Sequence, residues 1–144
     1  DTKQDEHVSL QRVHICNIKK SIRTIINHTK KCEGRAVYLS TKSLKHIYDR
    51  HIYDKGVPND LALILENLIP TLKYPDKVYK NLPEKRGDFL LAKKINKRIY
   101  LCMVEIWTHE KTDIIEIISA SFTGEKYLKK FTVLWSWRTA TSSS

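Results

Sequence analysis

Residues 37–53 decide the fold and read Val-Tyr-Leu-Ser-Thr-Lys-Ser-Leu-Lys-His-Ile-Tyr-Asp-Arg-His-Ile-Tyr. The apolar run at 36–39 predicts a short strand. A helix is predicted to follow at once, because the hydroxyl of Thr41 or Ser43 can accept a hydrogen bond from the free N–H groups of its first turn. We expect the rest of the chain to present this helix to a sheet.

The predicted helix has two faces with different chemistry. Spacing of i, i+3, i+4 and i+7 predicts a buried stripe of Leu44, Ile47, Tyr48 and His51. The adjacent face carries His46, Asp49, Arg50 and Tyr53. An imidazole and a guanidinium one turn apart suit phosphate chemistry, because one can move a proton while the other holds negative charge. His46 and Arg50 are therefore candidate site residues, and His51 is the second candidate for the proton acceptor.

Along the chain, the spacing of apolar residues changes from the period of about 3.6 typical of helices to the period of 2 typical of strands. Helices are expected at about 18–30, after Ser43, from Asp60 to a break at Pro70, and at 125–130. Strands are expected at 8–16, 36–39, 77–80, 88–95, 98–107, 112–122 and 133–135, with a tight turn at Asn96-Lys97. The order predicts an α+β domain in which N-terminal helices pack on a four- to five-stranded antiparallel sheet. We expect one domain over 1–138 and a disordered polar tail at 139–144.

Two of these strands are informative about position and chemistry. The strand at 98–107 is apolar on both faces, which predicts a place in the middle of the sheet. In 112–122, strict alternation predicts that Glu116 shares one face with Ala120 and Phe122. The same alternation gives the other face three successive hydroxyls: Ser119, Ser121 and Thr123. Hydroxyls beside basic residues can bind phosphate oxygens, although they can equally well satisfy a strand end.

The chain of 144 residues has a formal net charge of +10, which favours a polyanionic partner. Residues 73–98 carry nine basic side chains against three acidic ones. Arg86 and Lys93 are the catalytic candidates of this stretch. The residues expected to bind RNA are Lys45, Arg50, Tyr79, Lys85, Lys94 and Arg98. A merely solvated lysine-rich face is the alternative.

Three cysteines do not make a disulfide framework, and their odd number indicates a reducing compartment such as the cytoplasm. Pairs at His14-x-Cys16 and His28-x3-Cys32 do not have zinc-finger spacing, so no metal and no cofactor is expected. No apolar run approaches the ~20 residues of a membrane helix. Because the sequence begins at Asp1, we expect a processed product or a domain cut from a longer protein.

The segments 38–47, 73–80, 86–94, 100–105 and 127–135 resemble phage-type members of the barnase–EndoU–colicin–RelE superfamily of ribonucleases, in order and in spacing. The resemblance covers about 37–137. It implies one or two helices on a four-stranded antiparallel sheet and metal-independent RNA cleavage. Many members are toxins paired with an inhibitor, and several cut tRNA. They include the C-terminal toxin domains of contact-dependent inhibition proteins, which are delivered by a larger secreted protein.

The resemblance supports particular residues of this chain. Its Leu-Lys-His motif supports His46, its Arg-Gly-Asp-Phe motif supports Arg86, and its Ser-Phe-Thr motif supports Ser121 and Thr123. No glutamate base is assigned by it, because nothing in the sequence places Glu105 or Glu116 in a site.

Together these observations predict an endoribonuclease that cleaves RNA, tRNA in particular, to a 2′,3′-cyclic phosphate. His46 would take the 2′-hydroxyl proton, Arg86, Lys93 or Arg50 would hold the charge on phosphorus, and Ser121 and Thr123 would orient the phosphate. An acidic immunity protein is the expected protein partner. The alternatives are a non-catalytic RNA- or DNA-binding module and an interaction domain that docks on an acidic protein.

Overall fold

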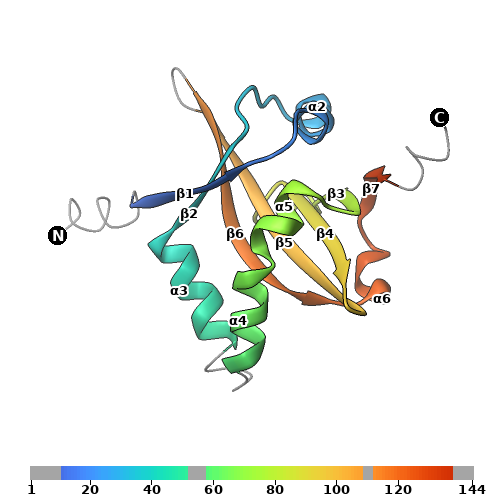
Figure 1. Cartoon of the computed structure of the whole chain (residues 1–144). Helices are drawn as coiled ribbons and strands as arrows, with labels where there is room; N and C mark the ends of the chain where they lie inside the picture. Colours follow the sequence, from blue (N-terminus) through green and yellow to red (C-terminus); the bar gives the residue numbers. More distant parts are fainter. Residues whose placement is uncertain (1–10, 52–57, 109–111, 138–144) are drawn as a thin grey trace.

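The computed structural model describes residues 11–51, 58–108 and 112–137. Its strands are β1 (Arg12–Asn17), β2 (Ala36–Ser40), β3 (Lys77–Lys80), β4 (Phe89–Ile95), β5 (Arg98–Thr108), β6 (Asp113–Thr123) and β7 (Thr132–Ser136). Its helices are α2 (Lys20–Thr29), α3 (Thr41–Asp49), α4 (Pro58–Glu66), α5 (Leu68–Lys73) and α6 (Glu125–Leu128) (Figure 1). Tyr53 and the predicted polar tail lie outside the described residues.

Within the described residues, seven strands form one open sheet in the order β1-β2-β6-β5-β4-β3-β7. Neighbouring strands are antiparallel except β2 and β6, which are parallel. The α+β class and a mostly antiparallel sheet are confirmed, whereas the expected four or five strands are wrong, and one pair is parallel. The sheet is wider because the short strands β1, β2 and β7 join its edges through partners that are remote in the sequence.

The strands in the middle of the sheet agree with the prediction from the sequence. β5 is the fourth of the seven strands and pairs with β4 and β6 along most of its length, as its apolar faces predict. Asn96 and Lys97, with φ angles of 50° and 70°, form the tight turn between β4 and β5. The predicted position of β5 and this turn are both confirmed.

α3 begins and packs differently from the prediction. Ser40, not Thr41 or Ser43, is the N-cap, and its hydroxyl accepts a hydrogen bond of 3.0 Å from the Ser43 N–H. Ser43, Ile47 and His51 are buried at a spacing of four, whereas Leu44 and Tyr48 are 40% and 45% exposed. The predicted stripe is wrong for these last two residues, because α3 packs on β2 and β6 with a narrow band of side chains.

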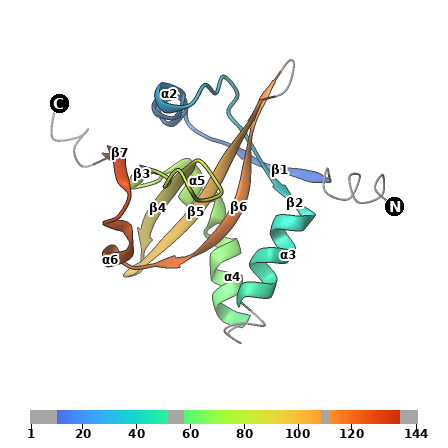
Figure 2. The same cartoon turned by 180° about the vertical axis from the view of Figure 1, so that it is seen from behind.

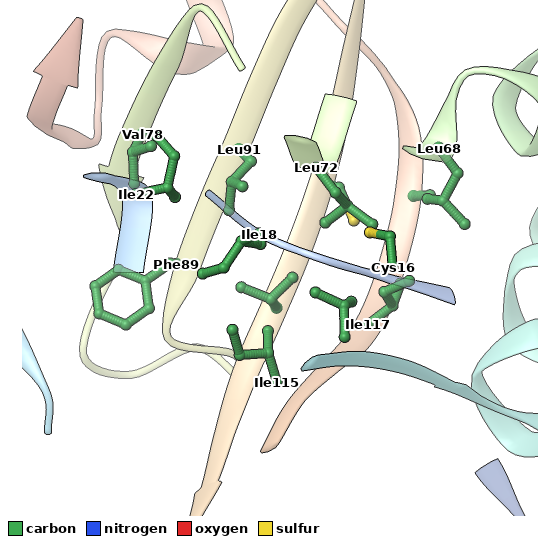
Figure 3. Close-up of a cluster of buried hydrophobic side chains, with 14 of the residues drawn as sticks. Cys16, Ile18, Ile22, Leu68, Leu72, Val78, Phe89, Leu91, Ile115 and Ile117 are labelled. Atoms are coloured by element: carbon green, nitrogen blue, oxygen red, sulfur yellow. The ribbon is translucent and has the colours of Figure 1, made fainter. Parts of the chain in front are cut away.

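The helices α2, α3, α4 and α5 bury their apolar side chains against one face of the sheet, which we call the helical face. Figure 3 shows part of this core, where Ile18 and Ile22 meet Phe89, Ile115 and Ile117. The opposite face, which we call the distal face, carries a second, smaller cluster under α6. Its buried members are Tyr79, Leu90, Ala92, Leu101, Leu128 and Phe131. Figure 2 shows the molecule from behind, with α6 at the end of β6.

Candidate functional site

A β-bulge in β6 decides which side chains reach the distal face. Ile117 pairs with Val104 and Ser119 pairs with Met103, so Ile118 has no partner in β5. The extra residue shifts the alternation by one position. The predicted face is therefore wrong for Glu116, whereas Ser119, Ser121 and Thr123 share one face as predicted. Glu116 lies on the distal face together with Ser119, Ser121 and Thr123, while Ala120 and Phe122 face the helices.

Four side chains form a row across the distal face at the level of Glu116. The strand registers pair His14 with Tyr38, Tyr38 with Glu116, and Glu116 with Glu105. Since directly paired residues point to the same side of a sheet, each of these four residues is the neighbour of the next, with His14 and Glu105 at the two ends. The row contains two carboxylates, an imidazole and a phenol.

Glu116 is the buried member of this row. Its Oε2 accepts hydrogen bonds from Nε and Nη2 of Arg12, at 3.2 and 3.1 Å, and its side chain is only 6% exposed. The Arg12 guanidinium also lies 5.7 Å from the ring centroid of Trp107. A buried carboxylate is stabilised as an anion only with such a partner, so Arg12 and Glu116 form a structural ion pair.

Glu105 is the accessible carboxylate, with a side chain that is 22% exposed. Its Oε2 accepts a hydrogen bond of 3.2 Å from the Gly87 N–H and lies 3.9 Å from Arg86 Nε. The loop that carries Arg86 is held by Asn81, whose side-chain amide donates to the carbonyls of Arg86 and Gly87. Gly87 has a φ of 95°, and a Cβ there would meet the Met103 side chain. This geometry holds the backbone of Arg86 and Gly87 beside Glu105.

His14 and Tyr38 complete the row on its β1 side. Their ring centroids are 5.4 Å apart, and His14 Nε2 lies 2.9 Å from the Asn17 side-chain oxygen. The His14 ring is exposed, so it is accessible for proton exchange with a bound ligand. Sequence reasoning considered His14 only as a metal ligand and left Arg12 and Tyr38 unremarked.

The structure separates the predicted catalytic residues. Arg86 lies at the row, whereas Ser121 and Thr123 lie four and six β5 positions further along, opposite Leu101 and Ile99. At about 3.3 Å per residue this puts Thr123 about 20 Å from Glu105. His46 is exposed on α3, which packs on the helical face. His51 is 1% exposed, with Nε2 3.2 Å from the Ala120 carbonyl oxygen, so a substrate cannot reach it.

Two further predicted residues, Lys93 and Arg98, contact different parts of the molecule. Lys93 Nζ donates to the Tyr74 carbonyl at 2.8 Å and lies 3.7 Å from Asp76 Oδ1. Arg98 pairs with Asp60 at 3.2 Å and stacks on Phe122.

Two of the predicted RNA-binding residues lie away from the row, and one lies beside it. Lys45 is 3.8 Å from Asp49, and Arg50 is exposed at the end of α3. Lys85 is exposed next to Arg86. Tyr79 is buried, with its ring edge on Phe131, so it is no exposed stacking platform. Tyr79 and Lys94 line one pocket together with Lys93, and Lys94 lines a second with Arg98 and Thr123.

The three thiols are all buried and free, and burial raises their pKa values. Within the described residues, no three side chains of the His, Cys, Asp and Glu types gather as a metal site would require. None of the helices in the described part of the chain combines the length and the apolar character needed to cross a bilayer. Comparison of the chain with family models, with curated proteins and with solved structures finds no match.

Proposed function

We propose that this protein is a metal-independent endoribonuclease that cleaves RNA by attack of a 2′-hydroxyl on the adjacent phosphate. The observation that carries the proposal is the pairing of Glu105 with Glu116 on the distal face, with Arg86 beside the first carboxylate and Arg12 beside the second. The resemblance to the barnase–EndoU–colicin–RelE superfamily supports metal-independent RNA cleavage but assigns no role to either glutamate.

In this proposal Glu105 takes the proton from the 2′-hydroxyl. It is the accessible carboxylate, and a positioned proton acceptor typically contributes 10²–10⁴-fold in rate. Glu116 is held as an anion by Arg12 and positions the row rather than reacting. The base role thus passes from His46, which lies on α3, to Glu105.

Arg86 meets the charge that develops on phosphorus. Its backbone is held by Asn81, and its exposed guanidinium would move from Glu105 to a phosphate oxygen when RNA binds. The leaving 5′-oxygen takes its proton from water, because His14, the exposed imidazole of the row, stands three strand spacings of about 4.8 Å from Glu105. The oxygen that attacks forms a bond to phosphorus as the 5′-oxygen departs, which leaves a 2′,3′-cyclic phosphate and a 5′-hydroxyl.

RNA is the proposed substrate because the chain has a net charge of +10 and the reaction needs a 2′-hydroxyl. Transfer RNA is the class that the resemblance favours. A basic toxin of this kind would be neutralised by an acidic protein covering the distal face, and it would act in the cytoplasm after delivery by a larger secreted protein.

The test is incubation of the protein with total tRNA in EDTA, beside Glu105→Gln and the control Glu84→Gln. Glu84 is exposed in the same loop as Arg86, so its substitution makes the same change of charge away from Glu105. We expect fragments with 2′,3′-cyclic phosphate ends from the wild type and from Glu84→Gln, and at least 100-fold less from Glu105→Gln. Intact tRNA with salt-dependent binding would instead identify a non-catalytic RNA-binding module.

A further inference from the structure

A pocket of about 450 Å³ lies where β3 and β4 meet the segment from α6 to β7. Its floor is apolar and consists of Tyr79, Ala92, Ile99 and Leu128. Its rim carries Lys77, Lys94, Ser136 and Trp137. Its size is within the range of small-ligand sites, and five of its eleven lining residues are charged. Nothing in the proposed chemistry at Glu105 uses this pocket.

In the described part of the structure, some charged groups around the pocket have partners of opposite charge and others do not. Asp76 is occupied, because one oxygen lies 3.7 Å from Lys93 Nζ and the other accepts a 2.8 Å hydrogen bond from the Lys94 N–H. Among the described residues, the ammonium groups of Lys77 and Lys94 have no such partner. Lys94 also borders a second hollow of about 370 Å³, which adds Lys97 and Thr123. Glu125, which lines both, is the one acidic group there besides Asp76. The unpaired ammonium groups suit an anionic ligand.

Aromatic surface accompanies this charge. Trp137 is 43% exposed at the rim, whereas the ring of Tyr79 is buried in the floor and does not offer a stacking face. Aromatic rings next to lysines are the combination that binds unpaired nucleotides, since the ring stacks on the base while the cation neutralises the phosphate.

The pocket is connected to the proposed cleavage site along the distal face. The registers place Ser121 opposite Leu101, Leu101 opposite Ala92, and Ala92 opposite Lys77. One level further along the strands, Thr123, Ile99 and Lys94 form a second row. Six β5 positions separate Ile99 from Glu105, about 20 Å at ~3.3 Å per residue. The hydroxyl side chains Ser119, Ser121 and Thr123 of β6 lie on the distal face between Glu105 and the pocket.

We propose that this pocket is a nucleotide-binding subsite for an unpaired part of the same RNA strand that is cleaved at Glu105. The base lies on the apolar floor against Trp137, and Lys77 and Lys94 bind the flanking phosphates. The inference rests on the proposed ribonuclease function. It adds that the enzyme holds its substrate at two points, so long single-stranded segments bind better than the minimal cleavable unit.

The test measures binding and cleavage separately. A 2′-O-methyl oligoribonucleotide, which has no free 2′-hydroxyl and cannot be cut by this reaction, is titrated into the wild type, Lys77→Ala, Trp137→Ala and the control Lys80→Ala. Lys80 is exposed and lies on the same short strand as Lys77. Because side chains alternate along a strand, Lys80 points to the face opposite that of its neighbour Tyr79, away from the pocket. We expect Lys77→Ala and Trp137→Ala to weaken binding at least fivefold, and Lys80→Ala less than twofold. The slope of log affinity against log salt should fall by about 0.7 for Lys77→Ala only.

Each outcome decides between the two proposals. If all three variants bind like the wild type while the wild type still cleaves tRNA, the subsite is refuted and the ribonuclease stands. If the two pocket variants lose binding but the wild type leaves tRNA intact, the subsite stands as part of a binding protein and the ribonuclease is refuted. If the wild type neither binds nor cleaves, both proposals are wrong.

Discussion

Glu105 and Glu116 are direct partners across β5 and β6, so two carboxylates stand side by side on the distal face, each beside its own arginine. Like charges directly opposite each other destabilise a sheet, and here the two guanidinium groups offset the repulsion. The two pairs differ in exposure, because Arg12–Glu116 is largely buried and Arg86–Glu105 is open to solvent. This difference separates effects on stability from effects on cleavage.

Arg12→Ala should destabilise the fold. Glu116 would be left as a buried carboxylate without its guanidinium, and removing one partner of a buried ion pair costs about 3 kcal/mol or more. Urea unfolding measures the change. The double variant Arg12→Ala/Glu116→Gln should regain most of the loss, because no buried charge remains. A double variant as unstable as the single one would contradict the assignment of this pair as structural.

Arg86→Ala should lower kcat for RNA cleavage by about 100-fold, since a preorganised donor to developing charge is worth that much. The fold should be unaffected, because the Arg86 side chain is 58% exposed. The neighbouring exposed Lys85→Ala is the matched control, with a small effect on KM alone. Equal losses in both variants would mean that the loop supplies only general positive charge.

His14→Ala and His46→Ala should behave differently. His14 is exposed in the row three strands from Glu105, so its loss should weaken RNA binding and raise KM while kcat stays within about twofold. His46 lies on α3 and its substitution should leave the rate within twofold of the wild type. The kcat and KM of both variants are measured on the same tRNA in EDTA. A large loss of kcat in His46→Ala would return the proton-transfer role to His46.

Cys32 should make stability depend on pH in the alkaline range. Burial, assisted by the Asp113 carboxylate, raises the pKa of this thiol from 9.0 to about 11. The unfolded chain ionises it at the lower value, so the free energy of unfolding falls as pH rises from about 9 through 11. Urea unfolding at pH 8 and pH 10 tests this, and Cys32→Ala should reduce the slope. An unchanged slope would show that other groups account for the loss.

The sequence predicts local structure better than it predicts pairing. Most helices and strands of the described residues match the predicted ranges to within a few residues, because periodicity and turn residues are local signals. The predicted break at Pro70 is wrong, because α4 ends at Glu66 and α5 runs through Pro70 to Lys73. The parallel pairing of β2 with β6 was not predicted, because nothing in the sequence around Val37 or Ile115 indicates a partner so far along the chain.

The candidate site shows the same limit. Arg86, Thr123 and Lys94 could be selected from charge and hydroxyl patterns, but the row of His14, Tyr38, Glu116 and Glu105 could not. It depends on the bulge at Ile118, which leaves no mark in the hydrophobic alternation. Without the bulge, Glu116 would face the helices, and the two carboxylates would not meet.

The parallel junction between β2 and β6 has a consequence for how the molecule is made. The β1–β2 pair is synthesised early, yet it can join the sheet only after β6 has been produced. Such long-range pairing is slow compared with local contacts, so this docking should be a late step of folding. The row from His14 to Glu105 crosses that same junction. A nascent or partly folded chain therefore carries the groups of this row in two separate pieces, and closing the junction brings them together.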